Sequence, residues 1–314
     1  MKLPEKKARN TLQISFQLKN FKMNNPVMLA SGVVGVHPDI FPRVAEAGAG
    51  AIVTKSISME PREGYPNPTV VEVEGGFVNA IGLSNPGIDA FSKELATLEE
   101  KPLPIVVSLF GSTPAEFGDL VSKLESVSVD CYELNLSCPH VEKVGLELGQ
   151  DPEAVAAVVK AAKKFASRPI LIKVSPHIAD IVEIVSVAKD SGADGVTAIN
   201  TLRAMVIDIE SGRPILSNNV GGLSGSAIKA IAIRSVYDIS QKVDIPIIGC
   251  GGITRWSDAI EFFLAGASAV QVGSAVAYKG LDILSEIVNG IEKYMNNHKI
   301  KKIGDIIGRS YSSQ

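Results

Sequence analysis

Cysteine is scarce in this chain, and its scarcity excludes several kinds of site. The 314 residues include only three cysteines, Cys131, Cys138 and Cys250. An odd and sparse set does not form a disulfide framework, and no cluster has the spacing of zinc ligands or of an iron–sulfur cluster. We therefore expect neither a metal site nor a second redox centre in this chain.

Long apolar runs and blocks of like charge are missing too. No stretch reaches the roughly 18 apolar residues that suggest a membrane-spanning helix. The N-terminal residues MKLPEKKARN contain no apolar signal core. Acidic and basic residues are interleaved at a net charge of -3, so nothing favours nucleic acid or an anionic membrane surface. We expect a cytoplasmic protein that binds neither nucleic acid nor membrane.

What the sequence does contain is a regular alternation of short apolar runs and longer amphipathic segments. Eight runs rich in Val and Ile have the near-continuous apolar character of parallel strands that are buried on both faces. They lie at 26–32, 51–56, 105–111, 131–138, 170–176, 195–201, 245–252 and 269–275. Helical segments between them include 151–166, where Asp151 before Pro152 suits a helix N-terminus, and 226–243.

Eight strand-then-helix units without a break in composition predict one α/β domain over residues 1–314, a closed (β/α)8 barrel of the TIM type. An open doubly wound sheet is the alternative, but the count of eight and the lack of an early GxGxxG fingerprint favour the barrel. Two stretches outside the repeat, 57–85 and 202–224, follow strands, so we expect them as insertions on the top, C-terminal face of the barrel. Residues 1–25 include a predicted hairpin that could cover the opposite end.

Glycine-containing pairs lie where the seventh and eighth strands are predicted to end. These pairs are Gly251–Gly252 and Gly273–Ser274. Glycine lets backbone N–H groups approach a phosphate closely, and the loops after these two barrel strands often form a phosphate site. Tight turning between strand and helix explains either pair equally well by itself, but both pairs in this order favour phosphate.

Two lysines, Lys55 and Lys173, interrupt apolar strands near the same rim. A lysine in such a strand is rarely buried without a partner, so a carboxylate or a side chain that reaches the solvent accounts for either one. Together, above a phosphate site, they favour an anionic ligand or an electron-rich cofactor. A positive charge near a flavin would stabilise its reduced form.

Asparagine and cysteine complete the candidate rim. The asparagines at strand ends or in top-face loops are Asn79, Asn85, Asn135 and Asn200. Amides suit a planar ligand with carbonyl and N–H edges, although turn formation explains Asn85 best. Cys138 lies at the rim, where a thiolate acts as a nucleophile or general base, while a small buried hydrophobic role is the alternative.

The chain resembles the class 1 dihydroorotate dehydrogenases over nearly all of its length. The resemblance rests on NAIGLSNPG at 79–87, ELNLSCPH at 133–140, INT at 199–201, GGLSG at 221–225 and GCGGI at 249–253. Each segment is weak alone, but all of them in this order and spacing are specific. The resemblance implies an enzyme that binds FMN and oxidises dihydroorotate to orotate in pyrimidine biosynthesis.

The resemblance also implies which residues hold the two ligands. Those implied to contact FMN are Ser31, Lys55, Ser56, Ser108, Asn135, Lys173, Ile199, Gly225, Gly251, Gly252, Gly273 and Ser274. Those implied to hold the substrate are Lys55, Asn79, Ala80, Ile81, Gly82, Leu83, Asn135, Asn200 and Thr201. Cys138 is the implied base, with Lys55 as the second catalytic residue. Ser108 departs from the family, which usually has asparagine near the flavin at that position.

Two of these segments, NAIGLSNPG and GGLSG, look closer to class 1B. That class implies a separate electron-transfer subunit that carries FAD and an iron–sulfur cluster. Because most soluble oligomers are symmetric dimers, we expect a homodimer core. A soluble acceptor such as fumarate is the alternative, as in class 1A. Two other functions stay open: a related FMN barrel that acts on another dihydropyrimidine, and a barrel that binds ligands without turnover. The set of Lys55, Cys138 and Lys173 argues against the last.

Overall fold

The computed structural model describes residues 12–35, 37–136, 148–177 and 180–311, and their centre is a closed barrel of eight parallel strands. The strands are β3 (Val27–Leu29), β4 (Ala51–Val53), β7 (Ile105–Leu109), β8 (Cys131–Asn135), β9 (Ile170–Val174), β10 (Gly195–Ala198), β15 (Ile247–Cys250) and β16 (Ala269–Val272). Their order around the barrel follows the chain, and β16 closes it by pairing with β3. The predicted TIM barrel is therefore confirmed, and each of the eight apolar runs contains one barrel strand.

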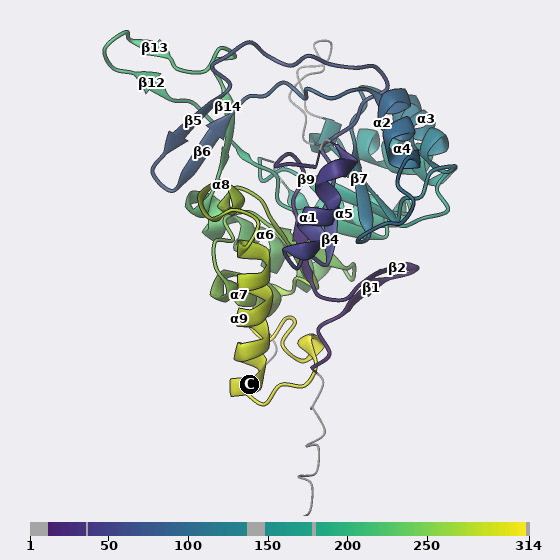
Figure 1. Ribbon diagram of the computed structural model, residues 1–314, viewed down its shortest axis with the longest axis vertical. Coiled ribbons are helices and arrows are strands. Elements are labelled where there is room, and N and C mark those ends of the chain that lie inside the picture. The colour runs from purple at the N-terminus through teal and green to yellow at the C-terminus, as the bar shows by residue number, and fades with distance from the viewer. Residues whose placement is uncertain (1–11, 36, 137–147, 178–179, 312–314) are drawn as a thin grey trace, which may run out of the picture.

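Helices connect the strands and cover the outside of the barrel (Figure 1). The α-helices are α1 (Phe41–Glu46), α2 (Ile88–Ala96), α3 (Pro114–Leu124), α4 (Pro152–Lys163), α5 (Ile181–Asp190), α6 (Lys229–Lys242), α7 (Trp256–Ala265), α8 (Ala275–Lys279) and α9 (Ile283–Asn297). Short 3-10 turns lie at Pro38–Ile40, Leu148–Gln150, Ser226–Ile228 and Ile303–Asp305. The side chain of Asp151 caps α4 by accepting from the backbone N–H of Glu153, as the sequence predicts. Within the described ranges, no helix combines the length and apolar character needed to cross a membrane.

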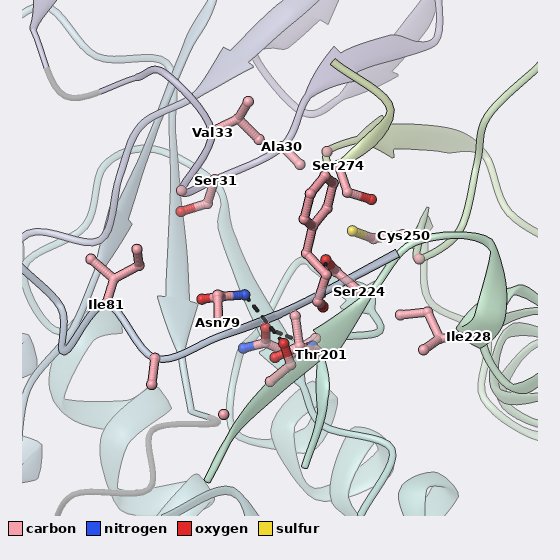
Figure 2. A pocket seen from close by; sticks show the side chains of 18 of the residues that line it. Ala30, Ser31, Val33, Asn79, Ile81, Thr201, Ser224, Ile228, Cys250 and Ser274 are labelled. Carbon is pink, nitrogen blue, oxygen red and sulfur yellow. Dashed lines mark hydrogen bonds between the residues drawn. The ribbon is translucent and has the colours of Figure 1, made fainter. Parts of the chain in front are cut away.

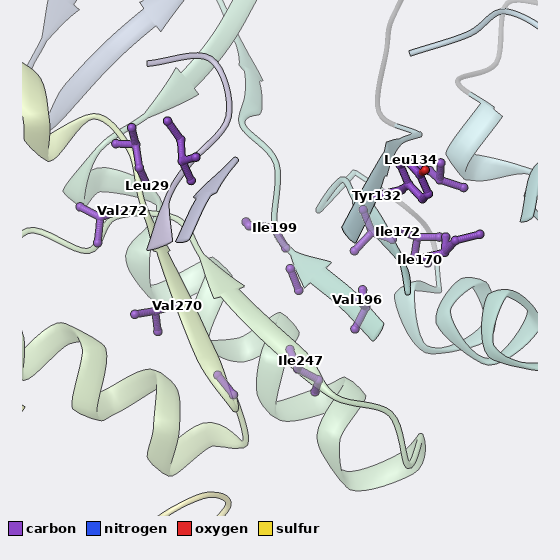
Figure 3. Close-up of a cluster of buried hydrophobic side chains, with 14 of the residues drawn as sticks. Leu29, Tyr132, Leu134, Ile170, Ile172, Val196, Ile199, Ile247, Val270 and Val272 are labelled. Atoms are coloured by element: carbon purple, nitrogen blue, oxygen red, sulfur yellow. The ribbon is translucent and has the colours of Figure 1, made fainter. Parts of the chain in front are cut away.

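Successive residues of each strand face two different cores, because side chains alternate across a strand. In β9, Ile170 and Ile172 pack outward against the helices, in the cluster that Figure 3 shows. Leu171 packs inside the barrel instead. Lys173 shares the parity of Leu171, so its side chain also belongs to the barrel interior, one layer nearer the C-terminal end.

A short hairpin closes the N-terminal end of the barrel. It consists of β1 (Phe16–Leu18) and β2 (Phe21–Met23), with Lys19 at the turn in the left-handed region (φ 53°). Its buried apolar side chains form one cluster with residues of the barrel interior, including Met28 and Leu171. The hairpin therefore covers this end of the barrel.

The two insertions form one sheet on the C-terminal side of the barrel (Figure 1). Its strands are β5 (Val70–Val73), β6 (Gly76–Asn79), β11 (Leu202–Ala204) and β14 (Gly221–Ser224), in the order β11-β14-β6-β5. A separate pair, β12 (Ile207–Asp208) and β13 (Arg213–Pro214), projects beyond it. Asn79 of the first insertion lies opposite Gly222 of the second. The sequence predicts where the insertions lie but not that they share this sheet, which we call the insertion sheet.

Candidate functional site

A cavity of about 700 Å³ lies between the C-terminal ends of the barrel strands and the insertion sheet (Figure 2). Its floor is formed by residues at the ends of the barrel strands, and β6 and β14 contribute from the insertion sheet. Every residue that the resemblance implies for the site lines this cavity, except Ser108 and Cys138. Asn85, the remaining candidate asparagine, does not line it, and its Oδ1 accepts from the backbone N–H of Gly87 in a turn. Cys138 lies outside the described residues. Residues that are far apart in sequence therefore meet in one pocket, because all parallel strands of a barrel end at the same rim.

Ser108 lies one layer behind the pocket wall. Its side chain is fully buried, and its Oγ is 2.9 Å from Oγ of Ser56, which does line the pocket. The backbone N–H of Ser108 donates to Oγ1 of Thr54 at 3.1 Å. Ser108 therefore supports Ser56 from behind in this structure and does not itself form part of the pocket surface.

A chain of hydrogen bonds crosses the pocket from β4 to the end of β10. Nδ2 of Asn135 donates to Oγ of Ser56 at 3.1 Å, and Nδ2 of Asn200 donates to Oδ1 of Asn135 at 3.3 Å. Oδ1 of Asn200 in turn accepts from the backbone N–H of Thr201 at 2.9 Å. These bonds fix which end of each amide is the donor, so the pocket presents an ordered set of polar groups to a planar ligand.

The insertion sheet adds a further amide from the opposite side of the pocket. Nδ2 of Asn79 donates to the backbone carbonyl of Gly222 at 3.2 Å, which ties the two insertions together (Figure 2). The chain then turns through Gly82 (φ 78°) and Leu83 (φ 57°). Glycine takes this left-handed conformation at little cost, whereas leucine does so only where the surrounding structure holds it. The segment 79–83 is thus a preformed wall of the pocket.

The two predicted lysines differ in their surroundings. Lys55 follows β4, and among the described residues no hydrogen bond or ion pair holds its ammonium group. Burial lowers the pKa of Lys55 below its ordinary value. Its charge is therefore available to a ligand, in contrast to that of Lys173, which is bound within the barrel.

Lys173 is almost fully buried and belongs to a polar network inside the barrel. Its Nζ lies 3.5 Å from Oε1 of Glu133 and donates to Oε1 of Gln271 at 3.2 Å. Burial opposes the charge of Lys173, but the attraction of Glu133 outweighs it and raises the pKa of the ammonium. The floor of the pocket therefore carries a lysine that is fixed in place and stays protonated.

Sequence reasoning missed Glu133 and the pocket role of Cys250. Glu133 is fully buried in the middle of β8, and its signal is an acidic residue with the same parity as Asn135 in an otherwise apolar strand. Cys250 lines the pocket at the end of β15, although the sequence favours a purely structural role for it. Burial raises the pKa of the Cys250 thiol, and the charge of Lys173 offsets part of this rise.

The glycines after β15 and β16 differ in how much space a side chain would find at each position. A Cβ on Gly252 (φ 78°) would lie 2.7 Å from Cβ and 2.8 Å from the backbone nitrogen of Lys229, so the contact with the start of α6 alone requires glycine. A Cβ on Gly273 would meet nothing closer than 3.5 Å. In the part of the chain that the structure describes, the backbone N–H groups of Gly252, Gly273 and Ser274 donate to no acceptor. Free donors beside an open space fit the oxygen atoms of a phosphate.

Known proteins resemble this chain over almost its whole length. A family model described as Dihydroorotate dehydrogenase matches residues 13–295. The protein named dihydroorotate dehydrogenase B (NAD(+)), catalytic subunit, from Pyrococcus furiosus is 52% identical over 297 residues, which cover 95% of this chain and 98% of that protein. The protein of the same name from Methanocaldococcus jannaschii is 44% identical over 294 residues, covering 92% and 95%.

A solved structure supports the fold independently. The crystal structure of dihydroorotate dehydrogenase from Eimeria tenella in complex with ferulenol superposes with a TM-score of 0.82. The match covers 99% of this chain and 92% of that chain at 23% sequence identity. At this identity the likeness concerns the fold.

Proposed function

Because this chain belongs to the dihydroorotate dehydrogenase family, we propose that it oxidises dihydroorotate to orotate with FMN as its bound cofactor. The observation that carries the proposal is the composition of one cavity. It brings together an ordered set of amides with backbone donors and a Lys55 ammonium for which the described ranges offer no partner. A planar anionic substrate beside a phosphate-bearing cofactor needs all three.

The residues present fit FMN. A cavity of about 700 Å³ is within the range of pockets that hold cofactors and small ligands. The free N–H groups of Gly252, Gly273 and Ser274 would bind the phosphate, and Lys173 and Asn135 would lie against the ring system. When bound, FMN supplies a two-electron acceptor for the hydride that leaves C6 of the substrate.

The chain itself would bind, orient and deprotonate the substrate. Lys55 would pair with the carboxylate of dihydroorotate, and the segment 79–83 with Asn200 would hold the carbonyl and N–H edges of the ring. Cys138 would remove the proton from C5, a role that rests on the resemblance of NLSCPH to the family. The insertion sheet lines one side of the pocket and would limit the access of water.

The direct test of this function is the colour of the protein. We expect it to purify yellow, and we expect dihydroorotate to bleach the flavin under anaerobic conditions because hydride transfer needs no second protein. Dihydrouracil lacks the carboxylate that Lys55 would bind, so it should leave the colour unchanged. Bleaching by dihydrouracil alone would favour the other candidate, a related barrel that acts on a different dihydropyrimidine.

We propose that reoxidation of the flavin requires a second protein subunit. The relatives named above are catalytic subunits of NAD(+)-linked enzymes, which supports a separate subunit here, and we propose that it carries FAD and an iron–sulfur cluster. The present chain has only three cysteines, too few to ligate such a cluster with thiolates alone. Symmetric dimers are the commonest oligomers, so a homodimer of this chain is the proposed core.

Assays of the isolated chain distinguish the two acceptors. With dihydroorotate we expect little turnover with NAD⁺ until the partner subunit is added, because the two electrons accepted by the flavin would have to pass through the partner to NAD⁺. Fumarate should not substitute for the partner. Fast turnover of the isolated chain with fumarate would refute the partner and leave the dehydrogenase function intact.

Gly273 offers a selective test of the phosphate site. Gly273→Val adds a branched side chain that the surrounding protein can accommodate. The side chain would, however, occupy pocket space that the phosphate is proposed to fill. We expect the variant to fold and to bind FMN several-fold more weakly, measured as flavin content and by fluorescence titration of the apoprotein. Gly252→Val is unsuitable, because its side chain would collide with Lys229 whether or not a phosphate binds there. Full flavin content in Gly273→Val would place the phosphate elsewhere.

A further inference from the structure

A buried charge pair lies directly beneath the pocket floor. Glu133 is fully buried in β8 and Lys173 is 6% exposed in the neighbouring strand β9. Two ionised groups inside a barrel are costly unless each is held by partners, and their mutual attraction is worth most where water is excluded. The interior residues one layer below are apolar and include Cys131 and Leu171, so the pair lies between the apolar core and the pocket.

The two oxygen atoms of Glu133 have different partners. Oε2 accepts from Oγ1 of Thr197 at 2.7 Å and from Nε2 of Gln271 at 2.6 Å. Oε1 accepts no hydrogen bond in the described structure and lies 3.5 Å from Nζ of Lys173. One oxygen is thus fixed by the barrel, while the other provides the counter-charge for the lysine.

Among the described groups around Lys173, Glu133 is the strongest counter-charge. Cys250 approaches from β15 and adds a smaller attraction, which is limited because burial raises the pKa of its thiol. Lys55 lines the same pocket from the end of β4 and carries a charge of the same sign. Gln271 is neutral and is itself shared between Lys173 and Glu133.

We infer that Glu133 is a positioning residue that keeps Lys173 charged and fixed at the pocket floor, and that it thereby sets the redox potential of the bound flavin and the number of protons taken up on its reduction. The inference rests on the proposed FMN. In the parent, Lys173 holds its proton before and after reduction, so it contributes no proton uptake. Without Glu133, burial would no longer be offset, and Lys173 would take up its proton only when the bound cofactor gains negative charge.

The test is the pH dependence of the flavin midpoint potential in Glu133→Gln. Glutamine keeps the size of the side chain and an oxygen for Thr197 and Gln271, but it removes the charge. Each additional proton taken up with two electrons shifts the equilibrium tenfold per pH unit, which is about 30 mV. We expect spectroelectrochemical titration between pH 6 and 9 to give a steeper slope in Glu133→Gln than in the parent, by up to one proton.

Two matched variants separate charge from packing. Thr197→Val removes one hydrogen bond to Glu133 without changing any charge, and it should lower the melting temperature while leaving the slope of the parent. The double variant Glu133→Gln/Lys173→Met lacks the group that titrates, so its slope should return to that of the parent. A steeper slope that persists in the double variant would overturn the inference, as would a parental slope in Glu133→Gln.

Stability supplies a second measurement that needs no flavin. If Glu133→Gln fails to hold its fold because Lys173 is left as a buried charge without the carboxylate of Glu133, adding Lys173→Met should restore folding of the apoprotein. Failure of Lys173→Met to raise the melting temperature of Glu133→Gln would reduce Glu133 to a structural residue. A parent that binds no FMN at all would instead refute the proposed cofactor, and this stability comparison would still decide whether the two charges depend on each other.

Discussion

Cys138→Ala is expected to slow the reduction of bound flavin by dihydroorotate by a factor of about 10² to 10⁴. The proposed reaction needs a base at C5 while hydride leaves C6, and alanine cannot accept the proton. Anaerobic stopped-flow mixing at the flavin absorbance band measures this step without the partner subunit. Binding of orotate and content of FMN should be unchanged, because neither needs the base.

Cys131 is the matched control for this experiment. It is fully buried at the interior layer below the polar network, and burial raises the pKa of its thiol well above the ordinary value. Cys131→Ala should therefore change stability and leave the rate of flavin reduction close to that of the parent. An unaltered rate in Cys138→Ala would remove this cysteine from the mechanism.

Lys55→Met is expected to weaken orotate binding by roughly 10- to 150-fold. A charge-assisted hydrogen bond to a carboxylate is worth about 1.5–3 kcal/mol, and no described residue competes for the ammonium of Lys55. Perturbation of the flavin spectrum by added orotate gives the dissociation constant. Lys160→Met removes an exposed lysine from α4 and should leave it unchanged. Equal orotate affinity in the parent and Lys55→Met would assign the carboxylate to another group.

The pH dependence of orotate binding provides an independent check on Lys55. The ammonium is the binding form, and burial lowers its pKa, so orotate affinity should fall as pH rises through this lowered value. An exposed lysine would lose its charge only at higher pH. Lys55→Met should abolish the fall. The proposed Cys138 base would change in the opposite sense, because a thiol becomes the reactive thiolate as pH rises.

The fold could be predicted from the sequence because each strand is an uninterrupted apolar run. In a barrel covered by helices both faces of a strand are buried, so the strand is a continuous apolar run. Such a run can be recognised without knowing which strands lie beside it. The convergence of Lys55, Asn135, Asn200 and Gly273 on one pocket follows from the same topology, since parallel strands all end at one rim.

Pairings between distant residues could not be predicted in this way. Nothing in β6 or β14 alone specifies that Asn79 lies opposite Gly222, because the match depends on how both insertions leave the barrel. Glu133 and Lys173 belong to different strands, and only the register of β8 with β9 brings them together. The position of Ser108 behind Ser56 likewise depends on the pairing of neighbouring strands and not on the local sequence.

Closure of the barrel by β16 against β3 has a consequence for the protein during its synthesis. Val27 leaves the ribosome early, but its pairing partner Val270 is among the last strand residues to emerge. Until then β3 and β15 each present an unpaired edge, which is a template for aggregation. The proposed phosphate donors Gly273 and Ser274 emerge immediately after β16. A nascent chain should therefore capture its cofactor only as the barrel closes, and a prematurely terminated chain would lack the cofactor and expose both strand edges to chaperones and proteases.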